Sequence, residues 1–301
     1  MTQLIGSHNR RMALTWTWLS LVVAIAAAIV AALPGPLYRY GLISITDAFY
    51  MVMYGAWTGI AAVLAGIVGV VATILTRRFR MLGVAVLAIA IGLVTFIWPY
   101  TINRNAHIAP PIHSISTDTE HPPPFTALAD VRRNSLNGLV YGGNPGGNLA
   151  GAELSALRGF FNRPAGRASP RRKMAMKACR SWGPDCLAAV QAAYYPAIRP
   201  LELPHVPPDA AYAAALEAAR DMGWDIAAAN GGNRHIEATA TSFWFGFKAD
   251  IAIDVGAATG GGSIVNIRSE SRRGLTDLGA NARRVHTFLD NVQQNLPEPR
   301  S

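Results

Sequence analysis

The sequence predicts an α+β protein in which three N-terminal transmembrane helices precede an antiparallel sheet of about four strands with packed helices. The first observation is that residues 1–101 contain three long runs without a charged residue, each long enough for a membrane helix. The second is that short segments after residue 224 alternate apolar and polar residues, as half-buried strands do. The third is that the segments flanking these strands repeat apolar residues at helical spacing. We therefore expect a membrane anchor followed by a folded domain.

The composition divides in the same way as the apolar runs. The chain has 301 residues, of which 51% are hydrophobic and 15% are charged, whereas soluble proteins carry about 25% charged residues. The net charge of +9 comes from 27 Lys and Arg against 18 Asp and Glu, and several of the arginines flank the apolar runs. No zinc-finger, helix-turn-helix or RNA-binding pattern accompanies this charge, so nucleic acid is not an expected partner.

Three uncharged runs are the predicted spans, namely residues 13–33, 55–76 and 81–99. At 1.5 Å per residue, each helix covers about 30 Å, which is the hydrocarbon thickness of a bilayer. The first run could also be a cleaved signal peptide, but it is longer than the apolar core of about 7–15 residues that such peptides have. No ionisable residue lies inside any span, which disfavours a transporter.

The arginines predict the direction of insertion. Two precede the first span and three more fill the link at residues 77–80, whereas the loop at residues 34–54 carries a single arginine and one aspartate. The positive-inside rule then puts the N-terminus and the 77–80 link in the cytoplasm and the chain after the third span on the opposite face. For a bacterial protein, this means an inner-membrane anchor with a periplasmic C-terminal domain.

Small residues recur along the second span at Gly55, Gly59, Ala62, Gly66 and Gly69. Their spacing of three and four puts them on one helical face, where two backbones can approach closely. They could form a seam between two copies of the chain. Packing against the first and third spans of the same chain is the interpretation that we favour, and the oligomeric state stays open.

Beyond the anchor at residues 1–101, three further segments are expected. Residues 102–135 form an extended linker that leads into the domain, because its proline clusters disfavour regular structure. Residues 136–186 form a basic, Gly-rich insertion, which is either a solvated loop or a segment attracted to anionic lipid headgroups. Residues 187–301 form the α+β core. Four polar linker residues have no standard metal-site spacing, so we expect no metal there: His113, Asp118, Glu120 and His121.

Cys179 and Cys186 are the only two cysteines in the sequence. Gly183 and Pro184 lie between them, which suits a loop rather than a CxxC redox site. A structural disulfide is the favoured state, because the predicted compartment is oxidising. A catalytic thiol is the alternative, and no basic partner for it is evident in the sequence.

The core segment begins with a predicted helix that Asp209 caps and Gly223 ends. Strand patterns follow from Trp224 onward, and a last helix runs from about Asp277 to Asn295. Helices would then cover one face of an antiparallel meander. Alternating charges on the opposite face are typical of a solvated surface, and five residues belong to it: Glu237, Asp250, Asp254, Arg268 and Glu270.

Several stretches resemble, in order, the family known as domain of unknown function 1499. They read IHSISTDTEHPPPF, YPAIRPLELP, MGWDI, IEATATSFWFGFKADIAIDV and SIVNIRSESRRGLTDLGANARRVHTFL. The similarity spans roughly residues 112–289 and departs in the basic, cysteine-bearing insertion. The resemblance implies a domain of the cell envelope or membrane, and it implies no activity, because none is assigned to the family.

Two features are candidate contact sites. The first is an aromatic hairpin tip, which either closes the core or contacts the outer leaflet or an apolar ligand: Phe243, Trp244, Phe245 and Phe247. The second lies where the last strand turns into the last helix, whose N-terminus favours anions: Arg268, Arg272, Arg273, Asp277, Asn281 and Arg284. The alternative for this second group is a charge-paired junction that fixes the fold.

The function that the sequence favours is that of an integral inner-membrane protein displaying a periplasmic envelope-binding module. The sequence has no GxSxG, HExxH or Walker motif, so we assign no catalytic residue and no cofactor. The expected partners are membrane lipids, with an envelope protein or polymer as further candidates. The alternative is a hydrolase of an envelope lipid or polymer that uses paired acids such as Glu237 and Asp250.

Overall fold

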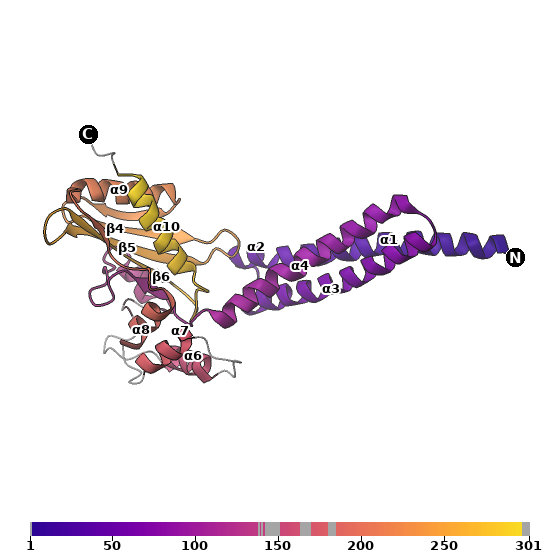
Figure 1. Cartoon of the computed structure of the whole chain (residues 1–301), viewed down its shortest axis with the longest axis horizontal. Coiled ribbons are helices and arrows are strands. Elements are labelled where there is room, and N and C mark those ends of the chain that lie inside the picture. Colours follow the sequence, from indigo (N-terminus) through magenta and orange to yellow (C-terminus); the bar gives the residue numbers. More distant parts are fainter. Residues whose placement is uncertain are drawn as a thin grey trace. The chain divides into compact units, whose positions relative to one another are not determined.

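The computed structural model describes residues 2–137, 139, 141, 151–162, 170–179 and 185–296. The chain divides into two compact units (Figure 1). Unit 1 contains residues 1–107 together with the short segment 243–246, and unit 2 contains residues 108–242 and 247–301. The predicted Gly-rich stretch at residues 142–147 lies outside the described residues. The unit boundary falls close to the predicted end of the anchor, but the hairpin tip belongs to the anchor's unit.

Unit 1 is a bundle of long apolar helices (Figure 1). It comprises α1 (Thr2–Ala32), the short α2 (Pro34–Arg39), α3 (Ile45–Leu75), the 3-10 turn η1 (Phe79–Met81) and α4 (Leu82–Ile108). Three segments of the described chain are long and apolar enough to cross a membrane, at Thr15–Arg39, Ile45–Leu75 and Phe79–Arg104. They contain all but at most two terminal residues of each predicted span.

The small residues of α3 allow the helices of unit 1 to pack closely. A Cβ added at Gly59 would lie 2.9 Å from the carbonyl oxygen of Gly92 in α4, and one added at Gly55 would lie 2.7 Å from the Cβ of Ala31 in α1. Such distances are shorter than real Cβ contacts, so only glycine fits without a shift of the neighbouring helix. The small-residue face is therefore buried inside this chain, as the favoured interpretation predicts.

Unit 2 is built around one antiparallel sheet (Figure 1). Its long strands are β3 (Asp225–Asn230), β4 (His235–Thr241), β5 (Lys248–Ala257) and β6 (Ser263–Ser271), and its short ones are β1 (Ser114–Ser116) and β2 (Leu201–Leu203). The strand order is β1-β6-β5-β4-β3, and β2 also pairs with β6. The prediction of about four strands is slightly low, because the two three-residue strands carry too short a pattern to recognise.

Helices α9 (Pro208–Asp221) and α10 (Ala280–Gln294) cover one face of this sheet (Figure 1). The isoleucines of the sheet and the apolar sides of the two helices form the core, which includes Ile236, Ile251, Ile253, Ala215, Val285 and Phe288. Four further helices complete the described unit: α5 (Ala129–Arg133), α6 (Gly151–Asn162), α7 (Pro170–Ala178) and α8 (Asp185–Tyr194). The prediction that Asp209 caps this helix is wrong, because the N-cap of α9 is Pro207 and Asp209 lies in the first turn.

The second face of the sheet differs from the solvated surface that the sequence suggests. It carries the predicted charged residues, but four of the five are buried: Glu237, Asp250, Arg268 and Glu270. Residues 125–132 and Leu139 cover them, with Phe125 and Leu128 packed on Ala252. Both faces of the sheet are thus closed, one by helices and the other by the segment predicted as a linker.

Candidate functional site

The hairpin between β4 and β5 ends in a compact aromatic tip. Its base is closed by two hydrogen bonds, in which the Ser242 amide donates to the Phe247 carbonyl at 2.8 Å and the Phe247 amide donates to the Ser242 hydroxyl at 2.8 Å. Gly246 adopts a φ of 67°, which is a left-handed conformation that glycine takes without strain. The intervening residues 243–246 belong to unit 1.

Trp244 is the most deeply packed residue of the tip. Its indole Nε1 donates to the carbonyl oxygen of Ala32 at 3.0 Å, and its ring centroid lies 4.6 Å from that of Trp98. A Cβ added at Gly35 would lie 2.5 Å from the indole ring. The Pro-Gly-Pro start of α2 therefore leaves a space that the Trp244 ring occupies.

Phe245 and the tip backbone make the remaining contacts within unit 1. The Phe245 ring lies 6.0 Å from Tyr38 and 5.8 Å from Phe49 between centroids, which is the range of favourable aromatic pairs. Arg39 Nη1 donates to the Phe243 carbonyl oxygen at 2.8 Å. Five hydrogen-bonding or ring partners from four helices thus hold the tip: Ala32, Tyr38, Arg39, Phe49 and Trp98.

Phe243 differs from Trp244 and Phe245 because its side chain is 92% exposed. It stands at the end of unit 1 where α1 ends, α3 begins and α4 passes Pro99. Large exposed aromatics gather at this end: Tyr40, Phe49, Tyr50, Tyr54, Trp98 and Tyr100. Tyrosine and tryptophan at the ends of apolar spans are typical of the membrane–water interface. The tip thus lies among the aromatic residues that would form such a belt at this end of unit 1.

The six residues of the predicted anion site do not come together. Arg268 and Arg272 lie on the sheet face that residues 125–132 cover, where they bond Glu270 and Asp250. Asn281 and Arg284 lie on the opposite face, where both contact the hydroxyl of Ser269. Arg273 is exposed and follows the end of β6. Successive strand residues point to opposite faces, which separates the first pair from the second.

The N-terminus of α10 already holds a carboxylate of its own chain. Asp277 accepts hydrogen bonds from the amides of Gly279 at 2.8 Å and Asn281 at 2.6 Å. Burial raises the pKa of Asp277, although these two hydrogen bonds and the nearby Arg284 act in the other direction. Burial also lowers the pKa of Arg284. Asp277 therefore satisfies the amides that a bound anion would need.

Glu237 is fully buried and accepts hydrogen bonds from the segment that covers the sheet. The amides of Thr126, Ala127 and Leu128 donate to its carboxylate at 2.7, 2.8 and 2.9 Å, and His235 Nε2 lies 3.0 Å away. Burial raises the pKa of Glu237, but the hydrogen bonds from His235, Thr126 and the amides outweigh it and lower the pKa to about 2. Glu237 is thus ionised, and its hydrogen bonds hold residues 126–128 on the sheet.

His235 lies between two carboxylates. Its Nδ1 is 2.5 Å from Asp254 Oδ1 and its Nε2 is 3.0 Å from Glu237 Oε1. Hydrogen bonds to Asp254 and then to Glu237 raise the pKa of His235 to about 9, against the opposing effect of burial. Near neutral pH the imidazolium form therefore donates to both acids.

A second buried cluster joins three arginines to two acids. Arg132 of α5 is fully buried, and it donates to Asp250 at 3.3 Å, to Glu270 and to the carbonyl of Asn137 at 2.9 Å. Arg272 donates two hydrogen bonds to the Asp250 carboxylate, from Nε at 2.9 Å and from Nη2 at 2.8 Å. Arg268 bonds Glu270 and lies 4.7 Å above the Phe125 ring. The carboxylates considered for acid–base chemistry are thus bonded to protein donors.

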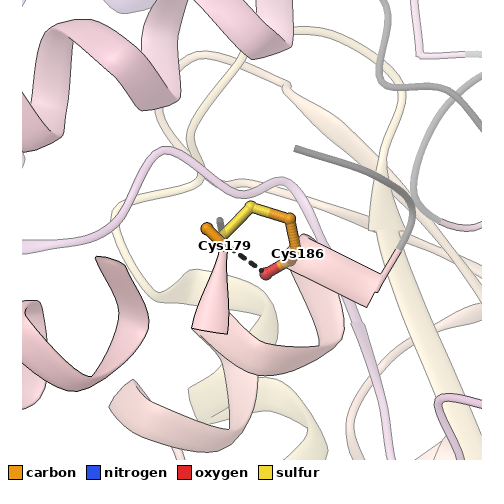
Figure 2. The surroundings of a disulfide bond; sticks show 2 residues. All are labelled: Cys179 and Cys186. Atoms are coloured by element: carbon orange, nitrogen blue, oxygen red, sulfur yellow. Dashed lines mark hydrogen bonds between the residues drawn. A yellow bond between two sulfur atoms is a disulfide. The ribbon is translucent and has the colours of Figure 1, made fainter. Parts of the chain in front are cut away.

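Two sets of polar residues outside the sheet complete the picture. The structure joins Cys179 to Cys186 in a buried disulfide between the end of α7 and the start of α8 (Figure 2). Asp118 accepts the amides of Glu120 and His121 at 3.0 and 2.8 Å in a surface turn. Among the described residues, no group of three or more His, Cys, Asp and Glu is placed to hold a metal ion.

Comparison with known proteins places the chain in a family. The family model described as a protein of unknown function, DUF1499, matches residues 114–292. A search of curated proteins found no match. The match covers more than half of the chain and contains every strand of the sheet. The chain belongs to the DUF1499 family, and three helices able to span a membrane precede the matched domain.

Proposed function

We propose that this DUF1499 protein is anchored in a bacterial inner membrane and displays its domain on the periplasmic side as a non-enzymatic binding module. In this proposal the aromatic tip contacts lipid at the outer surface of the bilayer. The chain connects the two units after residue 107 and again at both ends of the tip segment 243–246.

The observation that carries the proposal is the placement of the tip. Trp244 and Phe245 pack on the helix ends of unit 1, and Phe243 is left 92% exposed beside exposed tyrosines. A large aromatic side chain in water is unfavourable by about 1.5–3 kcal/mol relative to a buried one. At the level of the belt, the surroundings of Phe243 would be lipid headgroups and acyl chains, which remove this cost.

Two further observations support the periplasmic side. The exposed arginines at positions 77, 78 and 80 lie at the other end of the helices, next to η1, which fits a cytoplasmic link. The Cys179–Cys186 disulfide is typical of an oxidising compartment.

The buried acids support binding rather than hydrolysis. A general acid near neutral pH needs a pKa close to the working pH, whereas Glu237 has a pKa of about 2. Asp250 is fully buried and accepts hydrogen bonds from Arg272 and Arg132. Glu237 and Asp250 instead hold the covering segment on the sheet face.

A pair of reporter fusions tests the membrane arrangement. Alkaline phosphatase and a fluorescent protein that folds only in the cytoplasm would each be fused after Ser301 and, as a control, inserted in the link after Arg78. We expect phosphatase activity at Ser301 and fluorescence at Arg78. Fluorescence from the Ser301 fusion would contradict the proposed topology.

A further inference from the structure

The end of the sheet that leads into the tip carries two free cations. Lys248 begins β5 and is exposed, and Arg273 follows the end of β6 and is exposed. Neither side chain makes a hydrogen bond or ion pair with another residue in the described parts of the chain. The Arg272 amide donates to the Lys248 carbonyl at 3.0 Å, so Lys248 lies opposite Arg272, and Arg273 is the next residue along the chain.

Chain connectivity brings Lys248 to the membrane anchor. Only Phe247 separates it from Gly246, which belongs to unit 1. Successive Cα atoms are about 3.8 Å apart, so the Cα of Lys248 lies within about 7.6 Å of the Cα of Gly246. This limit holds however the two units are arranged, and it puts the lysine side chain within reach of the surface that the tip enters.

Two acids on the strands at this end do not cancel the two charges. Asp250 lies on the same sheet face as Lys248, but its Oδ1 accepts a hydrogen bond from Arg272 Nη2 at 2.8 Å. The exposed Asp225 begins β3, which is two strands away from β5 in the sheet. Neighbouring strands are about 4.8 Å apart, so Asp225 is about 10 Å from the β5 backbone. The β5–β6 half of this end is therefore net positive.

We propose that Lys248 and Arg273 bind the phosphate groups of anionic phospholipids in the leaflet that the tip enters, which rests on the proposed membrane contact of the tip. Cations next to an interfacial aromatic residue are suited to the negative headgroups of that leaflet. A basic residue near a membrane surface favours anionic lipid by about 1 kcal/mol, which is about a fivefold preference for each residue. The domain would then select the lipids around its own anchor.

The test uses the full chain in nanodiscs that contain equal amounts of phosphatidylglycerol and phosphatidylcholine. A photoreactive benzoylphenylalanine replaces Phe243, and mass spectrometry counts the lipid adducts of each kind after illumination. We expect phosphatidylglycerol adducts to exceed phosphatidylcholine adducts by at least fivefold. In the double variant Lys248→Gln/Arg273→Gln, the ratio should fall to about one while the total adduct yield is kept.

A matched control separates this effect from the overall charge. The double variant Arg199→Gln/Arg234→Gln also removes two positive charges; Arg234 lies in the turn at the opposite end of β4, where it pairs with Asp209. It should keep the wild-type adduct ratio. An equal ratio of the two lipids in the wild type, with abundant adducts, would overturn the headgroup proposal alone. The lack of any lipid adduct would overturn the tip contact on which it rests.

Discussion

The polar face of the sheet and the hairpin tip both concentrate residues that often mark binding sites, yet the structure uses them in opposite ways. On the sheet face, Arg132, Glu237, Asp250 and Glu270 are fully buried and bonded to protein partners. At the tip, Phe243 is 92% exposed and its two aromatic neighbours only hold it in place. Charges here fix the fold, whereas an exposed aromatic residue remains available for contact.

This difference has a physical reason. An ionised side chain can be buried only if its partners replace the lost hydration, so a buried charged cluster has little capacity left for a ligand. An aromatic ring has no such requirement, and it gains free energy from any apolar surroundings. The following changes test the two roles, and the largest effect is expected on the sheet face.

Replacement of Arg132 with Ala should cause the largest loss of stability. It leaves Asp250 and Glu270 with fewer partners inside a closed layer, and a broken buried pair costs about 3–5 kcal/mol. Arg133→Ala is the matched control, because Arg133 is exposed and pairs with the exposed Asp130, which contributes less than about 1 kcal/mol. Denaturant unfolding of the full chain in detergent measures both. Similar losses for the two variants would contradict the structural role of the cluster.

The hydrogen bonds of His235 to Asp254 and Glu237 should make the folding stability fall at alkaline pH. The pKa of His235 is about 9 in the folded chain and 6.5 as its ordinary value, so its stabilisation is fully present below pH 6.5 and is lost as the pH rises through 9. In the His235→Gln variant, the melting temperature should depend less on pH between pH 6 and pH 10. His286→Gln, which changes an exposed histidine paired with Asp290, is the control. An unchanged alkaline decline in His235→Gln would show that another group titrates.

Replacement of Trp244 with Ala should loosen the tip without unfolding the domain. It removes the hydrogen bond to Ala32 and the contact with Trp98, and an aromatic pair contributes about 0.5–1.5 kcal/mol beyond its buried area. Amide exchange at residues 242–247 should accelerate by up to about tenfold, while exchange in β5 and β6 stays slow. Phe243→Ala is the control and should leave tip exchange unchanged. Fast exchange throughout β5 would mean that Trp244 supports the sheet itself.

Much of the fold could be predicted because its signals are local. The uncharged runs indicate the spans, and the alternation in β4, β5 and β6 indicates the helix-covered face. The burial of Glu237 and Asp250 could not be predicted in this way, because it depends on residues 126–132, more than a hundred positions earlier in the chain. One indirect signal was available, because His235 lies two residues before Glu237 on one strand face.

The candidate sites show the same limit. The tip is evident from its four aromatic residues, but only the structure distinguishes the packed Trp244 from the exposed Phe243. The predicted anion group mixes residues of both sheet faces, since alternation along β6 sends Arg268 and Ser269 to opposite sides. Lys248 was missed because a single lysine at a strand end has no distinctive pattern.

The depth of position 243 in the bilayer tests the membrane contact of the tip most directly. Because Cys179 and Cys186 are joined, Phe243→Cys provides a single free thiol for an environment-sensitive fluorophore in the full chain, reconstituted in liposomes. We predict strong quenching by lipids brominated near the headgroup and weak quenching by iodide in the water. The same label at Asn233, in the exposed turn at the far end of the hairpin, should show the reverse. A label at position 243 that iodide quenches as fully as it does at Asn233 would contradict the membrane role of the tip.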